Sequence, residues 1–444
     1  MGAKIVKKAE SLSPANEIFE DEFVKLSDLK ISQSSLKDSS IRISGQISEL
    51  SFNNKWIEII ELFHPLNEKL PEFANTEFEA DLRSKISFAL NQLNRFDEAI
   101  IELKTALNSQ PDRFIFHHNL AYTAYNSLYS AKNKDVFLRG NHKKERIELA
   151  KKHFQAAIAI KPDTITNFYR MGMLVKEFEG KPDKAINYFF SAVKNWENLL
   201  DEEKEKRHQE KKNYIKALYQ LASVLLKSGK TNQPLLYLNK CIEYDNETNY
   251  LLPQNKFFAL GKIYFAISDY QKAIKSLELA MEYSEKKQDY IVELLARTYF
   301  FSDKAEKGLK TINLLNSNYM KPYCRWTKAD ILSSLGKFDQ AEELLTDKIE
   351  SDMRSRHKTL IKLSRIRYLR GDFSKALEFA IDAHNFSKKT WNNNNAESIY
   401  LQAVCHFKLK NSDKAIRAMA KLKEVNPAYS KLSVLEDKFS SLVS

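Results

Sequence analysis

Glycine and proline are scarce in this sequence, with 10 of each among 444 residues. Together they make up less than half of the share, about 12%, that is usual in globular proteins. Folds rich in β-hairpins need these residues at their turns, so the scarcity argues against an all-β fold. Hydrophobic residues account for 43% of the chain and charged residues for 29%, which is enough apolar material to bury a core.

Long apolar runs are also missing. No stretch approaches the roughly 18 uninterrupted apolar residues of a membrane-spanning helix. The first ten residues, MGAKIVKKAE, lack the apolar run of a secretory signal peptide. We therefore expect no transmembrane segment and a cytoplasmic location.

Cysteine is rare, and the three cysteines, Cys241, Cys324 and Cys405, lie more than 80 residues apart from one another. This spacing fits neither a metal site nor a redox pair. Each cysteine falls in an apolar stretch with helical periodicity. The sequence therefore predicts buried free thiols in a reducing compartment.

The motifs of common catalytic and cofactor sites are absent, including HExxH, glycine-rich phosphate loops and G-x-S-x-G. Arg113 and His118 form an R-x4-H string of the kind found in HEPN ribonucleases, but the polar residue that usually follows the arginine is missing. Such strings are common by chance. We expect no enzymatic activity, no cofactor and no metal.

The formal net charge is +12, and it is unevenly distributed. Residues 1–100 hold 12 basic and 17 acidic groups, whereas residues 351–444 hold 18 basic and 9 acidic groups. An acidic and a basic end can orient a charged partner, although solvated lysine-rich helix faces would give the same counts. No pure block of lysine and arginine is long enough for a nucleic-acid-binding arm, so nucleic acid is not the expected partner.

A pattern with a period of about 34 residues recurs along the chain. Each copy has an alanine near the start of a helix, a large residue four positions on and a small or apolar residue three further. Amphipathic segments with apolar residues at i, i+3, i+4 and i+7 precede these copies, for example at 114–125, 214–229, 255–269 and 397–410. The unit is therefore a helix–turn–helix. The second-helix segments lie at 95–111, 145–162, 181–196, 268–283, 336–349, 371–384 and 411–427.

This unit resembles the tetratricopeptide repeat. The best match is at 254–287, and we count about ten repeats over 40–429, of which the first, at 40–73, is degenerate. The resemblance implies an all-α fold, a right-handed α-solenoid in which small residues let paired helices approach closely and each hairpin stacks on the next. The matching residues at 254–287 are Phe257, Leu260, Gly261, Tyr264, Ala273, Leu277 and Ala280.

Four residues depart from the pattern, and two of them, Arg367 and His406, stand where tyrosine is usual. Pro234 stands where a small residue of a second helix is expected, which is tolerable only in the first helical turn. Gly308 replaces the usual alanine, which predicts either a cost of about 1 kcal/mol or a hinge.

We expect a serine-rich tail or cap over residues 1–39, the repeat array over 40–429 and a capping helix over 430–444. An insertion near 128–145 is either a projecting contact site for a partner or a longer first helix with a loop. The charged stretch 197–213 is interpreted as helical extensions and a loop.

In this family the first helices line a concave groove. The corresponding residues are aromatic and basic, which suits an extended or helical protein segment with acidic and apolar anchors. An alternative is that several of these aromatic residues only pack against the next repeat. The predicted partner-binding residues are Asn255, Lys262, Phe265, Tyr290, Arg297, Phe300, Tyr323, Trp326, Lys358, Arg365, Tyr368 and Tyr400.

One sub-family grips a C-terminal carboxylate with five residues. Only Asn119 and Arg170 match that set here, and Ser84, Phe88 and Thr166 replace the others, so no such clamp is predicted.

The sequence as a whole predicts a non-catalytic scaffold or adaptor that binds protein or peptide in its groove. The alternative is a protein that associates with RNA or an anionic surface through its basic C-terminal half, which a steep salt dependence would indicate. The oligomeric state is left open.

Overall fold

The computed structural model describes residues 36–230, 232–350 and 352–440. Within these ranges all regular elements are helices and no strand occurs. The predicted all-α class and the helix–turn–helix unit are therefore confirmed. The chain divides into two compact units, residues 1–180 (unit 1) and 181–444 (unit 2), and the division falls inside the predicted fourth repeat.

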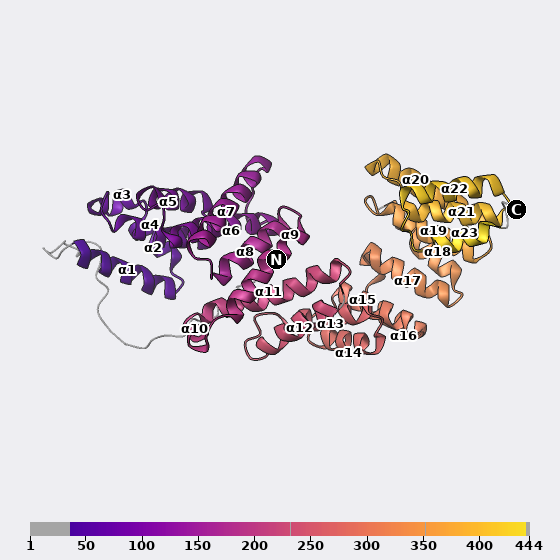
Figure 1. Ribbon diagram of the computed structural model, residues 1–444, viewed down its shortest axis with the longest axis horizontal. Coiled ribbons are helices and arrows are strands. Elements are labelled where there is room, and N and C mark those ends of the chain that lie inside the picture. The colour runs from indigo at the N-terminus through magenta and orange to yellow at the C-terminus, as the bar shows by residue number, and fades with distance from the viewer. Residues whose placement is uncertain (1–35, 231, 351, 441–444) are drawn as a thin grey trace. The chain divides into compact units, whose positions relative to one another are not determined.

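Unit 1 is a series of antiparallel helix pairs that begins with the long helix α1 and the short helix α2 (Figure 1). Its first helix begins at Leu36, inside the segment predicted as a tail or cap, and residues 1–35 lie outside the described part of the chain. The degenerate first repeat keeps a helical pair, but its second helix is short. The elements are α1 (Leu36–Phe52), α2 (Trp56–Phe63), α3 (Leu66–Lys69), η2 (Pro71–Phe73), α4 (Glu79–Gln92), α5 (Phe96–Ser109), α6 (Phe114–Asn133), α7 (Gly140–Ile160) and α8 (Ile165–Glu177).

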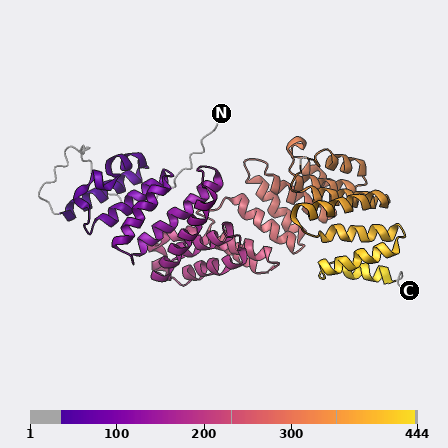
Figure 2. The ribbon, with the colours of Figure 1, turned by 90° about the horizontal axis from the view of Figure 1, so that it is seen from above.

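Unit 2 continues the pattern, and its successive hairpins lie side by side (Figures 1 and 2). Its first part contains α9 (Pro182–Glu197), α10 (Asp201–Lys206), α11 (His208–Lys227), α12 (Asn232–Tyr244), α13 (Pro253–Ala266), α14 (Tyr270–Glu282), α15 (Asp289–Phe301) and α16 (Ala305–Ile312). The remaining elements are η3 (Ser317–Tyr319), α17 (Pro322–Ser334), α18 (Phe338–Thr346), α19 (Arg356–Leu369), α20 (Phe373–Trp391), α21 (Ala396–Lys408), α22 (Ser412–Val425) and α23 (Leu432–Ser440).

The α13–α14 hairpin shows how the sequence specifies one unit. Pro253 occupies the first helical position of α13. An N–H at this position would have no acceptor within the helix, so proline costs no hydrogen bond there. The Asp269 carboxylate accepts a hydrogen bond from the backbone N–H of Lys272 at 3.2 Å and so caps the start of α14. Ala273 and Leu277 of α14 are fully buried, as the repeat pattern predicts.

Glycine lets the paired helices approach closely at two positions. A Cβ atom at Gly261 would lie 2.5 Å from Cγ of Leu277, and one at Gly308 would lie 2.8 Å from the carbonyl oxygen of Ala296. Both distances are shorter than van der Waals contact. Gly308 therefore marks a close contact between α15 and α16, and the structure gives this steric reason for the departure from alanine.

Gly308→Ala is expected to destabilise the protein by about 1–3 kcal/mol because the new methyl group overpacks the α15–α16 contact. Helix propensity alone predicts the opposite, a gain of about 1 kcal/mol. Gly45→Ala in α1 is the matched control, since nothing lies within 4 Å of a Cβ atom there and propensity alone should stabilise it. Urea denaturation of both variants measures whether each substitution raises or lowers the free energy of unfolding. A stabilised Gly308→Ala variant would show that the helices are not in close contact.

The structure describes the segments in which the sequence departs from the repeat pattern. Pro234 lies in the first turn of α12. The insertion near 128–145 consists mainly of longer helices, because α6 runs to Asn133 and α7 starts at Gly140. The charged stretch 197–213 contains α10 and the start of α11.

The C-terminal helix α23 packs on the last hairpin. Its Leu435 and Phe439 belong to the same buried cluster as Leu422, and the rings of Phe407 and Phe439 stack with centroids 4.9 Å apart. This contact covers the apolar end of the last repeat, as a capping helix does.

The three cysteines are fully buried and none forms a disulfide. Burial raises the pKa of each thiol, of Cys241, Cys324 and Cys405, to about 12. The prediction of buried free thiols is therefore confirmed. In the described ranges, no helix has both the length and the apolar character needed to cross a membrane.

Candidate partner-binding surfaces

The predicted partner-binding residues lie on five consecutive first helices of unit 2, namely α13, α15, α17, α19 and α21. We call the side chains at these positions the first-helix face. Residues of neighbouring helices contact one another along it. The Arg297 guanidinium lies 5.1 Å from the ring centroid of Phe265, and the Lys358 ammonium lies 5.5 Å from that of Trp326. These contacts join α13 to α15 and α17 to α19.

Many of the aromatic side chains of this face also pack between repeats. Phe300 and Tyr323 are half-buried against a core cluster that includes Val292 and Ile331. Phe265, Trp326 and Tyr400 pack in the same way on other clusters. The remaining two pair with aromatic neighbours: Tyr290 meets Phe258 edge-on at 4.6 Å, and Tyr368 meets Phe373 at 5.3 Å. These rings therefore stabilise the stack and leave only part of their area for a partner.

One end of the first-helix face is occupied by internal ion pairs. Arg365 of α19 binds Glu397 of α21, which also accepts a hydrogen bond from the Tyr429 hydroxyl at 2.6 Å. Burial alone would raise the pKa of Glu397, but these two hydrogen bonds outweigh it and lower the pKa. Lys362 likewise binds Asp330. Arg365 and Lys362 are therefore already paired with carboxylates of this chain.

The other end of the face presents a lysine in a different environment. Lys262 of α13 is half-buried, and among the described residues no carboxylate pairs with it. Burial lowers its pKa, and the positive charges of Lys227 and Arg297 lower it further. Lys262 lines a shallow recess between α11 and α13 together with Phe258 and other side chains. Arg297 already lies 3.3 Å from the carboxylate of Glu293, so an incoming carboxylate would chiefly offset the repulsion between Lys262 and Lys227.

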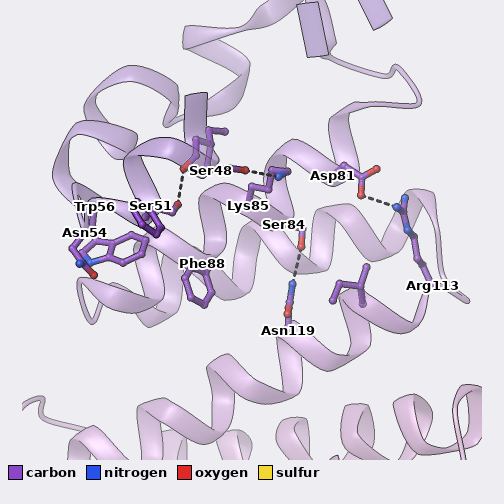
Figure 3. Close-up of a pocket in the computed structure, with 13 residues that line it drawn as sticks. Ser48, Ser51, Asn54, Trp56, Asp81, Ser84, Lys85, Phe88, Arg113 and Asn119 are labelled. Atoms are coloured by element: carbon purple, nitrogen blue, oxygen red, sulfur yellow. Dashed lines mark hydrogen bonds and ion pairs between the residues drawn. The ribbon is translucent and has the colours of Figure 1, made fainter. Parts of the chain in front are cut away.

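A second surface lies in unit 1, where α1, α4 and the start of α6 enclose a pocket of about 950 Å³ (Figure 3). We call it the N-terminal pocket. The rings of Trp56 and Phe88 meet edge-on across it at 5.7 Å. Its lining is mainly apolar with polar side chains at the margin: Ile47, Ser48, Ser51, Phe52, Asn54, Trp56, Asp81, Ser84, Lys85, Phe88, Arg113, Ile115 and Asn119.

In the sequence, Ser84, Phe88 and Asn119 were considered only as positions of a carboxylate clamp. The structure uses them differently: Asn119 donates a hydrogen bond to the Ser84 hydroxyl at 2.9 Å, while Phe88 exposes its ring to the pocket. The pocket itself was missed because Trp56 and Phe52 belong to the degenerate first repeat, in which the pattern assigns no positions.

Arg113 and His118 have separate partners. Arg113 forms an ion pair with Asp81 at 2.9 Å at the margin of the pocket, whereas Nδ1 of His118 lies 2.7 Å from the side-chain oxygen of Asn167 in α8. Arg113 and His118 of the R-x4-H string therefore contact different residues and do not form one site.

Comparison with known families settles the nature of the repeat. Family models described as tetratricopeptide repeat match residues 215–248, 257–287 and 397–428. These three stretches of the chain are tetratricopeptide repeats. The matched stretches coincide with the hairpins α11–α12, α13–α14 and α21–α22. No curated protein matches the chain in sequence.

Solved structures similar to the chain include repeat proteins of different origins. PilW, a type IV pilus biogenesis factor, is 16% identical with a TM-score of 0.41, and the match covers 50% of this chain and 97% of PilW. Yeast Tom70 is 12% identical with a TM-score of 0.41, over 92% of this chain and 96% of Tom70. A tetratricopeptide-repeat protein of Thermus thermophilus is 18% identical with a TM-score of 0.36, over 43% of this chain and 98% of its own.

Proposed function

We propose that this tetratricopeptide-repeat protein is a non-catalytic scaffold that binds a protein segment along the first-helix face of unit 2. A preformed surface of this kind orders an extended or helical ligand without being reorganised itself. The proposal includes the predicted chemistry of the partner, which carries acidic and apolar anchors.

The observation that carries this proposal is the environment of Lys262. It lies beside Phe258 and near two other cations, and no carboxylate among the described residues pairs with it. The acidic anchor of the partner is therefore assigned to Lys262, Lys227 and Arg297. Its apolar anchors are assigned to the half-exposed rings of Phe258 and Tyr290 next to them.

The alternative, binding of RNA or an anionic surface by the basic C-terminal half, is supported less well. Many basic groups of that region are engaged by acidic neighbours of the same chain. Arg367 binds Glu342, Arg370 binds Asp339 at 2.6 Å, and Lys423 binds Glu436 at 2.9 Å. Such pairs reduce the positive field that a polyanion would require.

Lys262→Glu is expected to weaken partner binding by at least about tenfold, because a repulsive carboxylate replaces the cation that receives the acidic anchor. Partners are first captured from the native source with the wild-type chain and identified by mass spectrometry. The affinity of each variant for the captured protein is then measured by calorimetry.

Lys275→Glu is the matched control, since it makes the same charge change at an exposed position on the second helix α14. It should leave the affinity unchanged. Equal affinities for both variants would reject the assignment of the acidic anchor to Lys262. Loss of binding in both variants to a nucleic acid or to anionic vesicles would favour the alternative function.

A further inference from the structure

The N-terminal pocket leaves large apolar side chains open to solvent. Among its lining residues Phe52 is 61% exposed, Phe88 41% and Ile115 39%. Figure 3 shows Phe88 and Trp56 directed into the same hollow. Clustered exposed apolar side chains around a concave surface mark a site that another segment covers.

The charged side chains at the margin of this pocket favour an occupant with a negative charge. Arg113 is already paired with Asp81, whereas the Lys85 ammonium contacts only the Ser48 hydroxyl, at 3.3 Å, among the described residues. Lys85 is therefore the cation left to receive a carboxylate. The pocket suits a segment that combines apolar side chains with an acidic group.

Such a segment is encoded in the same chain, before α1. In residues 17–26, EIFEDEFVKL, the apolar residues Phe19, Phe23 and Leu26 have the spacing i, i+4 and i+7, and four of the other residues are acidic. This spacing would place the three apolar side chains on one face if the segment formed a helix. We propose that residues 17–26 occupy the N-terminal pocket of their own chain, with Phe19, Phe23 and Leu26 against its apolar lining and an acidic side chain at Lys85.

The length of chain between this segment and the pocket permits the contact. α1 begins at Leu36, and the part of α1 that lines the pocket begins at Ile47. Eleven helical residues separate these two positions, which corresponds to roughly 16 Å along the helix axis. Residues 27–35 can extend over as much as about 30 Å, so residues 17–26 can reach back along α1 to the pocket.

This inference is independent of the function proposed for unit 2, because it concerns a different surface. It gives the predicted N-terminal tail or cap a defined place of contact. A segment of another protein with the same chemistry would have to displace residues 17–26 and would bind with a correspondingly lower apparent affinity.

Photo-crosslinking in the full chain tests the proposal. Phe23 is replaced by benzoylphenylalanine, and the crosslinked residues are mapped by mass spectrometry after irradiation. The proposal expects a product with the mass of one chain and with crosslinks to α1, α4 or the start of α6. The same probe at Ile5 is the control and should give few crosslinks to these elements. Products with the mass of two chains, or crosslinks that lie elsewhere, would overturn the proposal.

A charge exchange tests the role of Lys85. Lys85→Glu should lower the yield of pocket crosslinks by about 2- to 5-fold, as loss of an exposed ion pair allows. Adding Glu20→Lys and Glu22→Lys to that variant should restore the yield, which a merely misfolded pocket would not do. An unchanged yield in Lys85→Glu would contradict the assigned contact.

Discussion

Lys256→Met is expected to lower the free energy of unfolding by about 3–5 kcal/mol, because it leaves a buried carboxylate without its counter-ion. Asp245 is fully buried directly after α12, and the Lys256 ammonium of α13 lies 3.0 Å from its Oδ2 atom. The same carboxylate accepts hydrogen bonds from the backbone N–H groups of Tyr250 and Leu251, at 2.6 and 3.0 Å. The pair therefore fixes the whole connection between two repeats.

Two controls separate this effect from loss of a surface charge. Lys321→Met removes an exposed partner of Asp289 and should cost less than about 1 kcal/mol. The double variant with Asp245→Asn and Lys256→Met should recover part of the loss, since no buried charge is then left unpaired. Urea denaturation of these variants measures the differences. Equal effects of Lys256→Met and Lys321→Met would mean that Asp245 is accessible to water.

Acidification from pH 6.5 to 4 is expected to destabilise the protein through His153 of α7. Burial, followed by the charge of His117, lowers the pKa of His153 from 6.5 to about 4. The unfolded chain therefore takes up this proton at a higher pH than the folded chain does. The stability that depends on neutral His153 is fully present above pH 6.5 and decreases as the pH falls toward 4, by at most about 3 kcal/mol.

Hydrogen bonds hold the ring of His153 against the ring of His117. Nε2 of His117 lies 2.7 Å from the carbonyl oxygen of Pro111, so this nitrogen donates its proton there. Nδ1 of neutral His117 then accepts a hydrogen bond from Nδ1 of His153, at 2.8 Å. A proton on buried His153 would place a positive charge next to the stacked ring of His117 and near Lys104 and Lys152.

The variant His153→Gln tests this effect, because its side chain does not ionise between pH 6.5 and 4. Its stability should change less with pH than that of the wild type, and His142→Gln, at an exposed position of the same helix, should behave as the wild type does. Urea midpoints measured at pH 7, 6, 5 and 4.5 show how the stability of the wild type and of each variant depends on pH. Parallel slopes for His153→Gln and the wild type would contradict the assigned titration.

The sequence was sufficient to predict the repeat, because apolar periodicity and small residues such as Ala273 are local signals. The second-helix segments predicted at 95–111 and 411–427 correspond to α5 and α22 within a few residues. Contacts over longer separations could not be predicted. Nothing in the pattern links Asp245 to Lys256, and the steric need for Gly308 depends on the distance between α15 and α16.

The candidate surfaces show the same limit. The register of the first helices predicts a row of residues, since the repeat fixes their spacing. It could not predict that Glu397 binds Arg365 while no carboxylate in the described part of the chain pairs with Lys262, because an ion pair depends on side-chain geometry between repeats. The N-terminal pocket escaped prediction because α1 and α2 follow the repeat pattern poorly.

Hydrogen exchange of the full chain, with and without the captured partner, tests the central claim most directly. A scaffold that binds the acidic anchor of its partner at Lys227, Lys262 and Arg297 should show partner-dependent protection in α11, α13 and α15, with little change in the second helices α12, α14 and α16. Protection confined to these second helices, or none in unit 2, would contradict the account.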